Sequence, residues 1–405
     1  MYLIFLLLSV LTSPFSSVLA EDIPPLKKIT VTESNNYLPS METQLYPVDK
    51  FKIDELKKLR AYVENRIKFK SIQEPKIILE IMEWVSLQWE HNGFNEAPDG
   101  ASALDILKDV HTNKTCYRCV EYAQVTAEIL CAFGYPARRV ALRTIDVAYG
   151  GFGQGHVAVE VWSNTLGKWI FIDPQFSIYP VYKEKILNYY EIYEFKKKGQ
   201  FADITFNVMP AYVKDAQSSK DTTMSFDANF FDQNYRDFIQ RYFGYIGTSL
   251  HLKSADYSVV LGLDGKDQTF TFQGQPVSNG IFTHSPKDLY FELNQTLMVF
   301  HYQDQKNSAH HFQKQLEQLN IKTEEEYFEK MSLFSVKPDF TVSLLTNTPW
   351  HEHYEYRTAL DGTWIQVRGD SFIWSLTSGD NYLEARSVNT MGIPGPGTFM
   401  KIDYQ

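Results

Sequence analysis

The sequence predicts an α+β fold in which a helix-rich first part gives way to short strands. Three observations lead to this prediction. Between residues 54 and 133 the apolar side chains recur at helical spacing. From residue 139 the period changes to two, which is typical of half-buried strands. From about residue 254 the apolar runs are short, alternating and bounded by turn residues, which indicates a β-sandwich.

The helical part divides into four expected helices. They cover Asp54–Ile72, a segment that starts at Pro75 and closes at Asn92-Gly93, Ala101–Val110, and Cys119–Phe133. Gly134 supplies a stop for the fourth helix, and Pro136 prevents its continuation. Helical spacing returns at two later segments, Lys183–Lys198 and Asn234–Tyr245.

Three strands are expected to follow the fourth helix. They are Arg139–Thr144, His156–Trp162 and Lys168–Asp173, and the last two are joined by a tight turn. The glycine-rich stretch Gly150–Gly155 precedes the second strand and lacks the G-K-[ST] of a phosphate loop. We therefore interpret it as a cleft rim beside a helix packed on an antiparallel sheet.

The second half of the chain predicts a separate all-β domain. Its expected strands are Tyr257–Leu263, Thr269–Phe272, Leu289–Tyr302, Phe340–Leu345, Glu355–Ala359, Thr363–Val367, Ser371–Leu376, Tyr382–Val388 and Thr398–Tyr404. A helical insertion is expected over His310–Phe334. We thus expect a signal peptide at 1–20, a first domain at 21–253 and a β-sandwich with a helical insertion at 254–405.

Export is expected from the first twenty residues. Tyr2–Leu11 is almost wholly apolar, and Val18-Leu19-Ala20 is a small-residue cleavage pattern. No other stretch is long and apolar enough to span a bilayer, so we expect no stable membrane span after the signal is removed. The mature protein is expected to be periplasmic or extracellular.

Composition limits the partners. The 405 residues are 44% hydrophobic and 22% charged, which is typical of globular domains. The net charge is −10 with no long basic run, which argues against nucleic acid as a partner.

Two of the three cysteines form a C-x-x-C pair, Cys116 and Cys119. A thioredoxin-like redox pair needs a βαβ context, which the surrounding pattern does not provide. A zinc site needs a second pair of ligands, and Cys131 lies roughly 18 Å along the same helix from Cys119. We therefore expect no metal and no cofactor, and interpret Cys119 as a nucleophile at a helix N-terminus. Oxidation to a Cys116–Cys119 disulfide would block it.

A cysteine nucleophile needs an imidazole beside it and a carboxylate that orients the ring. His156 and Asp173 occupy the two strands after the helix. If Trp162 pairs with Trp169, these two side chains lie on one face of the hairpin, and a slip of one residue separates them.

Several motifs resemble the transglutaminase-like superfamily. They are C-V-E-Y-A from Cys119, G-Y-P-A-R-R-V from Gly134, H-V-A-V-E-V-W from His156 and W-I-F-I-D-P from Trp169, over roughly Trp84–Phe176. The resemblance implies a papain-like core with Cys119 as nucleophile, His156 as base and Asp173 as the residue that orients it. Two departures leave substrate preference open: Tyr117-Arg118 precedes the nucleophile where many relatives carry Gly, and the loop before His156 is unusually glycine-rich. The acidic calcium-binding loops of animal transglutaminases have no clear counterpart.

The stretch from Gln88 to Leu107 resembles the segment before the nucleophile in animal transglutaminases. This resemblance implies that the indole N–H of Trp89 stabilises the oxyanion, since acyl transfer needs a donor aimed at the developing charge. Trp84, Gln88 or the backbone N–H of Cys119 are alternatives. The final hairpin, Tyr382–Tyr404, is similar to that of immunoglobulin-like and fibronectin-type sandwiches.

We therefore expect an exported cysteine acyl-transfer enzyme that acts on amide bonds of peptides or proteins. Within the family, exported members with such modest cores imply hydrolysis rather than amine cross-linking. The alternative is a non-catalytic envelope or extracellular binding module. Trp350, Trp364 and Trp374 suggest a contact between the C-terminal domain and a cell-wall or surface glycan, with core packing as the competing role.

Overall fold

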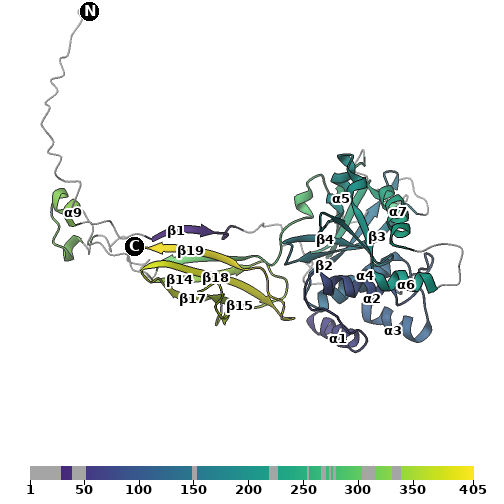
Figure 1. Ribbon diagram of the computed structural model, residues 1–405, viewed down its shortest axis with the longest axis horizontal. Coiled ribbons are helices and arrows are strands. Elements are labelled where there is room, and N and C mark those ends of the chain that lie inside the picture. The colour runs from purple at the N-terminus through teal and green to yellow at the C-terminus, as the bar shows by residue number, and fades with distance from the viewer. Residues whose placement is uncertain are drawn as a thin grey trace, which may run out of the picture.

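The protein has an elongated shape in which a helix-covered sheet lies beside a β-sandwich that extends away from it (Figure 1). The computed structural model describes residues 29–38, 52–147, 153–218, 227–252, 255–265, 271–272, 275–276, 280–302, 313, 316–330 and 339–405. The expected signal peptide at 1–20, residues 150–152 of the glycine-rich stretch and part of the expected insertion at 310–334 lie outside these residues. Among the described residues no helix is long and apolar enough to cross a bilayer.

The core is α+β, as the sequence predicts. Its six-stranded sheet has the order β12-β9-β8-β2-β3-β4. All neighbouring strands are antiparallel except β12 and β9. The strands are β2 (Ala137–Arg143), β3 (Gly155–Ser163), β4 (Lys168–Ile172), β8 (Tyr245–Leu252), β9 (Ala255–Gly262) and β12 (Gly280–Thr283).

The helices of the first part of the chain cover one face of this sheet (Figure 1). They are α1 (Ile53–Glu64), α2 (Lys76–Ser86), α3 (Ala103–Asn113) and α4 (Cys119–Ala132). Their buried apolar side chains form one core with the inner face of β3 and β4. The second face carries another apolar core, which includes α5 (Tyr189–Lys197), α7 (Ala228–Ile239) and the small sheet of β5 (Ile178–Tyr182), β6 (Lys185–Ile186) and β7 (Thr205–Val208). Helix α6 (Pro210–Ser218) follows β7.

The β-sandwich consists of two sheets that share one apolar core. One sheet has the order β1-β19-β18-β15-β16 and the other β13-β14-β17. The strands are β1 (Ile29–Ser34), β13 (Thr296–Tyr302), β14 (Asp339–Thr346), β15 (His351–Arg357), β16 (Ile365–Gln366), β17 (Ser371–Ser375), β18 (Gly379–Asn389) and β19 (Thr398–Tyr404). A short helix, α9 (Glu324–Lys330), and the hairpin of β10 (Thr271–Phe272) and β11 (Gln275–Pro276) complete the elements.

The strand order differs from the expected division of the chain in two places. β1, which lies within the expected first domain at 21–253, pairs antiparallel with β19 in the sandwich. The expected boundary after residue 253 falls between β8 and β9, which pair along their whole length within the core sheet. Strand pairing therefore places β9 and β12 with the core and β1 with the sandwich.

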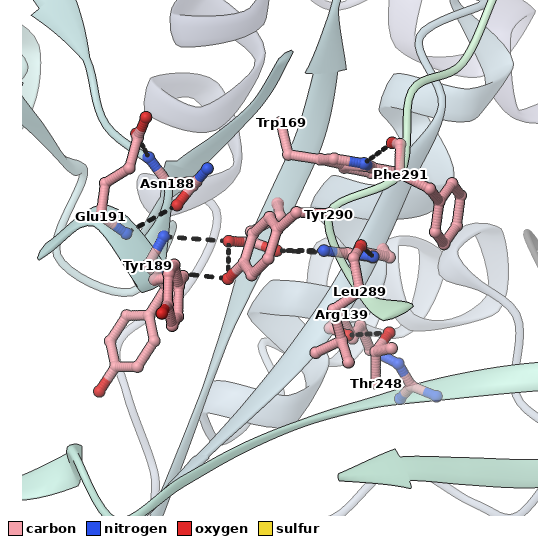
Figure 2. Close-up of polar contacts among 12 residues, drawn as sticks. Arg139, Trp169, Asn188, Tyr189, Glu191, Thr248, Leu289, Tyr290 and Phe291 are labelled. Atoms are coloured by element: carbon pink, nitrogen blue, oxygen red, sulfur yellow. Dashed lines mark hydrogen bonds and ion pairs between the residues drawn. The ribbon is translucent and has the colours of Figure 1, made fainter. Parts of the chain in front are cut away.

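A buried polar network joins the core sheet to the segment that leads to the sandwich. Arg138 of β2 forms an ion pair with Glu160 of β3 at 2.7 Å, and both side chains are buried. Glu160 also accepts hydrogen bonds from the Tyr290 hydroxyl and the Tyr189 backbone N–H. Figure 2 shows Tyr290 at the centre of these contacts, with the Trp169 indole donating to the Phe291 carbonyl alongside.

The loop at the end of β18 makes a second junction with the core. Gly134, which ends α4 with a positive φ, accepts a hydrogen bond on its carbonyl from the Asn389 side chain. A Cβ atom on Gly134 would approach the Ile393 side chain to 2.6 Å. The glycine is thus required both by the helix stop and by the close contact with the sandwich.

Candidate active site

Cys119 is the first residue of helix α4. Arg118 precedes it in an extended conformation, so the chain enters the helix at the cysteine without a side-chain cap. The first N–H groups of a helix have no intrahelical acceptor, and the helix dipole places partial positive charge there. The position of Cys119 at the helix N-terminus therefore stabilises negative charge on its sulfur. The residue is partly exposed.

His156 and Asp173 are hydrogen-bonded to each other. Trp162 pairs directly with Trp169 in the β3–β4 ladder, which confirms the predicted register. With this register His156 on β3 is diagonal to Asp173, which directly follows β4. His156 Nε2 lies 2.7 Å from Asp173 Oδ2, and the two side chains are 3% and 0% exposed.

The remaining ring nitrogen of His156 is Nδ1, which is left to face the sulfur because Nε2 is bound to Asp173. Burial disfavours the charged ring, but the Asp173 carboxylate and the hydrogen bond to Cys119 outweigh this and raise the pKa of His156 to about 10. Burial likewise opposes ionisation of Cys119, but hydrogen bonds from His156 and His91 lower the pKa of its thiol to about 6. The site thus favours a thiolate–imidazolium pair at neutral pH.

Asp173 is held by two further donors. The Tyr235 hydroxyl from α7 donates to Oδ2 at 2.7 Å, and the Gln175 backbone N–H donates to Oδ1 at 3.1 Å. Tyr235 is buried, and the sequence pattern did not single it out. No local signal indicates this contact, because Tyr235 is 62 residues away from Asp173 in the chain.

Aromatic side chains enclose the His156 ring. The ring centroids of Phe176, Phe238 and Tyr242 lie 5.9, 5.0 and 6.0 Å from that of His156. This surrounding excludes water from the ring, which strengthens its interaction with Asp173.

Trp89 is near the nucleophile, but its indole N–H is engaged. The N–H donates to the Tyr117 carbonyl at 3.3 Å, and the ring stacks on Tyr122 with a centroid separation of 4.2 Å. An indole has a single donor, so the expected oxyanion role of Trp89 has no free N–H in this arrangement. That role stays a prediction. Gln88 is engaged as well, through the Trp84 carbonyl and His111.

The other two cysteines lie apart from the Cys–His–Asp contact. All three cysteines are free thiols; Cys131 is buried within α4, and Cys116 is partly exposed before it. No group of three or more His, Cys, Asp or Glu side chains in the described part of the chain is arranged to hold a metal ion.

A cavity of about 720 Å³ lies beside the N-terminus of α4. Its lining includes Glu96, Arg118 and Glu121, and Arg118 forms ion pairs with both carboxylates. The lining does not include Cys119, His156 or Asp173, so this cavity is separate from the reactive groups.

Residues 60–174 match the family model of the transglutaminase-like superfamily, so the chain contains a transglutaminase-like core. This match supports an enzyme of the cysteine acyl-transfer type. No curated protein matches the chain.

Two solved structures are similar to parts of the chain. A proposed cysteine protease from Cytophaga hutchinsonii is 20% identical over 33% of this chain and 40% of its own, with a TM-score of 0.24. Red sea bream transglutaminase is 11% identical over 93% of this chain and 76% of its own, with a TM-score of 0.22. The chain thus spans less than half of the first structure.

Proposed function

We propose that the protein is a cysteine-dependent acyl-transfer enzyme that acts on amide bonds of peptides or proteins. The observation that carries the proposal is the continuous contact from the Cys119 sulfur through His156 to Asp173. Three positions support the proposal. The Cys119 thiol is at a helix N-terminus, the His156 imidazole is buried, and the Asp173 carboxylate is bound to Nε2 of that ring.

The mechanism follows from these positions. The Cys119 thiolate attacks the amide carbonyl carbon, and the C=O electron pair moves to oxygen to give a tetrahedral oxyanion. When the oxyanion collapses, the C–N bond breaks and His156 Nδ1 gives its proton to the leaving amine. Asp173 holds the ring throughout and stabilises its charged form. A thioester on Cys119 and a neutral His156 remain.

Water then resolves the thioester. Neutral His156 takes a proton from the water as it attacks, the C–S bond breaks, and the thiolate and a carboxylic acid are released. An amine in place of water would give a cross-link by the same route. We propose hydrolysis as the main outcome, on the analogy with exported members of the family stated above.

Export and partners belong to the same proposal. We propose a periplasmic or extracellular enzyme whose substrate is a peptide or protein, with no nucleic-acid partner. A glycan contact of the C-terminal domain stays a prediction. Trp350 and Trp374 are buried, and the guanidinium groups of Arg357 and Arg386 lie over the Trp364 ring. The three tryptophan rings therefore offer a glycan little exposed surface.

The test is a screen of peptide amides with wild type and the Cys119→Ala variant. We expect turnover that the variant lacks, with carboxylic acid as product even when monodansylcadaverine is present as a competing amine. Cleavage that persists in the variant contradicts the proposal. A dominant amine adduct would keep Cys119 as nucleophile and overturn the preference for hydrolysis. A wild type that never forms a covalent intermediate at Cys119 would favour the alternative, a non-catalytic binding module.

A further inference from the structure

A second histidine approaches the nucleophile from the segment between α2 and α3. This segment, residues 89–95, is fixed to the chain before Cys119 by three hydrogen bonds. The Trp89 indole and the Asn92 backbone N–H both donate to the Tyr117 carbonyl, at 3.3 and 2.9 Å. The Asn95 side chain donates to the Cys116 carbonyl at 2.8 Å. His91 lies in the sequence between the first two anchors, so its backbone is held next to the chain that leads into Cys119.

The His91 side chain is hydrogen-bonded to Cys119, and the contact favours the thiolate, as expected when the ring donates. It differs from His156 in its surroundings. His156 is buried and bound to Asp173, whereas His91 is exposed. The sulfur is thus contacted by a buried imidazole, His156, and by a second, solvent-exposed imidazole, His91.

The two imidazoles have different tasks when the thiolate reacts. As the C–S bond forms, negative charge leaves the sulfur and develops on the carbonyl oxygen, which is bonded to the same carbon. His156 must give its proton to the leaving group, so it cannot also stabilise this oxygen throughout the step. A solvent-exposed donor that already contacts the sulfur needs to shift only slightly to follow the charge.

The other side chains considered for this task are engaged. The Trp89 N–H donates to Tyr117, and the Gln88 amide contacts Trp84 and His111. The backbone N–H of Cys119, at the first helical position, supplies one donor of an oxyanion site. A second donor is expected beside it, since such sites pair two donors on one oxygen.

We propose that His91 is a catalytic residue that donates a hydrogen bond to the carbonyl oxygen of the tetrahedral intermediate, together with the Cys119 backbone N–H. The inference rests on the proposed function, because it assumes that Cys119 is the nucleophile. His91 performs no proton transfer in this role, so the ring needs only one N–H directed at the oxygen.

The experiment compares two reactions of the same sulfur. With p-nitrophenyl acetate the thiolate attacks the ester carbonyl, an oxyanion forms, and p-nitrophenolate leaves with the electron pair of the broken C–O bond. With iodoacetamide the thiolate displaces iodide at a saturated carbon, and no oxyanion forms. Both rate constants are measured at a pH above the inflection of the Cys119 thiol, for wild type, His91→Ala, His91→Gln and the neighbouring control Glu90→Gln.

We expect His91→Ala to slow acylation by p-nitrophenyl acetate on the order of 10²-fold and to leave iodoacetamide alkylation close to wild type. His91→Gln retains an N–H donor and should recover most of the lost rate, and Glu90→Gln should match wild type in both reactions. Because His91 is exposed, these variants are expected to fold, and undiminished alkylation itself reports an intact site.

Two results would overturn the inference. Equal slowing of both reactions would mean that His91 acts on the thiolate alone, and no slowing of either would mean that it has no role. A wild type that shows no burst of p-nitrophenolate, or a burst that persists in Cys119→Ala, would instead overturn the proposed function on which the inference rests.

Discussion

Replacing His156 with alanine removes the main donor that keeps Cys119 ionised. Burial by itself raises the pKa of the Cys119 thiol, and contacts with His156 and His91 bring it from 9.0 to about 6. Without the imidazole the pKa should return toward 9.0. Since the lowered pKa populates the thiolate above about pH 6, wild-type reactivity is lost only as the pH falls through that value.

The size of the effect depends on the pH of the assay. At about pH 6, a thiol with a pKa of about 6 is half ionised and one with a pKa of 9.0 about 0.1% ionised, a ratio of about 500. The less acidic thiolate is the better nucleophile, by about 20-fold over three pKa units at a Brønsted slope near 0.45. The variant should therefore react about 20-fold more slowly at pH 6. The same arithmetic gives only about fourfold at pH 7, so mildly acidic conditions are the sensitive ones.

The assay is limited alkylation with iodoacetamide, with the label at each cysteine quantified by peptide mass spectrometry. Partly exposed Cys116 serves as an internal reference, and buried Cys131 becomes labelled only if the chain unfolds. We expect selective labelling of Cys119 in wild type and loss of this selectivity in His156→Ala. Equal, slow labelling of all three cysteines in wild type, or an unchanged rate at Cys119 in the variant, would refute the reasoning.

Three further predictions concern the groups around the site. Asp173→Asn should lower kcat on a peptide amide by about 10³- to 10⁴-fold. The same variant should move the basic limb of the pH–rate profile to lower pH, because the carboxylate raises the pKa of the histidine that it holds; an unshifted limb contradicts this. Tyr235→Phe removes a buried donor to Asp173 and should lower the free energy of unfolding in urea by about 1.5–3 kcal/mol, whereas unaltered stability would show that the hydroxyl contributes nothing. Glu160→Ala leaves the Arg138 guanidinium buried without its partner and should cost about 3–5 kcal/mol by the same measurement; a loss below about 1 kcal/mol would argue against a buried ion pair.

Local patterns in the sequence predicted much of the core. The helix that starts at Cys119 was readable from its apolar spacing and from Gly134, and the structure places α4 over Cys119–Ala132. The sequence left the Trp162–Trp169 pairing as a condition for bringing His156 and Asp173 together, and the structure shows that pairing. These signals act within about twenty residues of chain, where spacing alone decides which side chains share a face.

Long-range pairing lies beyond such patterns. β1 carries the β-branched run Ile29–Thr32, a strand signal that the polar surroundings obscured, and its partner β19 lies at the opposite end of the sequence. Most of β9 was predicted as the strand Tyr257–Leu263, but its spacing gives no indication that β12 pairs with it in parallel. The division of the chain into domains therefore stays a prediction, and the sheet order refines where its boundary should be sought.

Hydrogen-bond direction at the site was equally hidden from the sequence. The resemblance to animal transglutaminases pointed to Trp89, but only the position of the Tyr117 carbonyl shows where its N–H points. His91, two residues further on, lies in the same stretch but was not singled out, and its contact with Cys119 depends on how the 89–95 segment is anchored. A donor's neighbourhood can be predicted from sequence, whereas its target depends on the tertiary structure.

The central claim is that Cys119 forms a covalent acyl-enzyme, and trapping that species tests it most directly. Wild type is mixed with p-nitrophenyl acetate, quenched in acid within the burst phase and digested for peptide mass spectrometry. We predict one acetyl group per chain, located on the peptide that contains Cys119 and absent from the Cys119→Ala variant. Acetylation of Cys116 or of lysines instead, or the same label in the variant, would contradict the account.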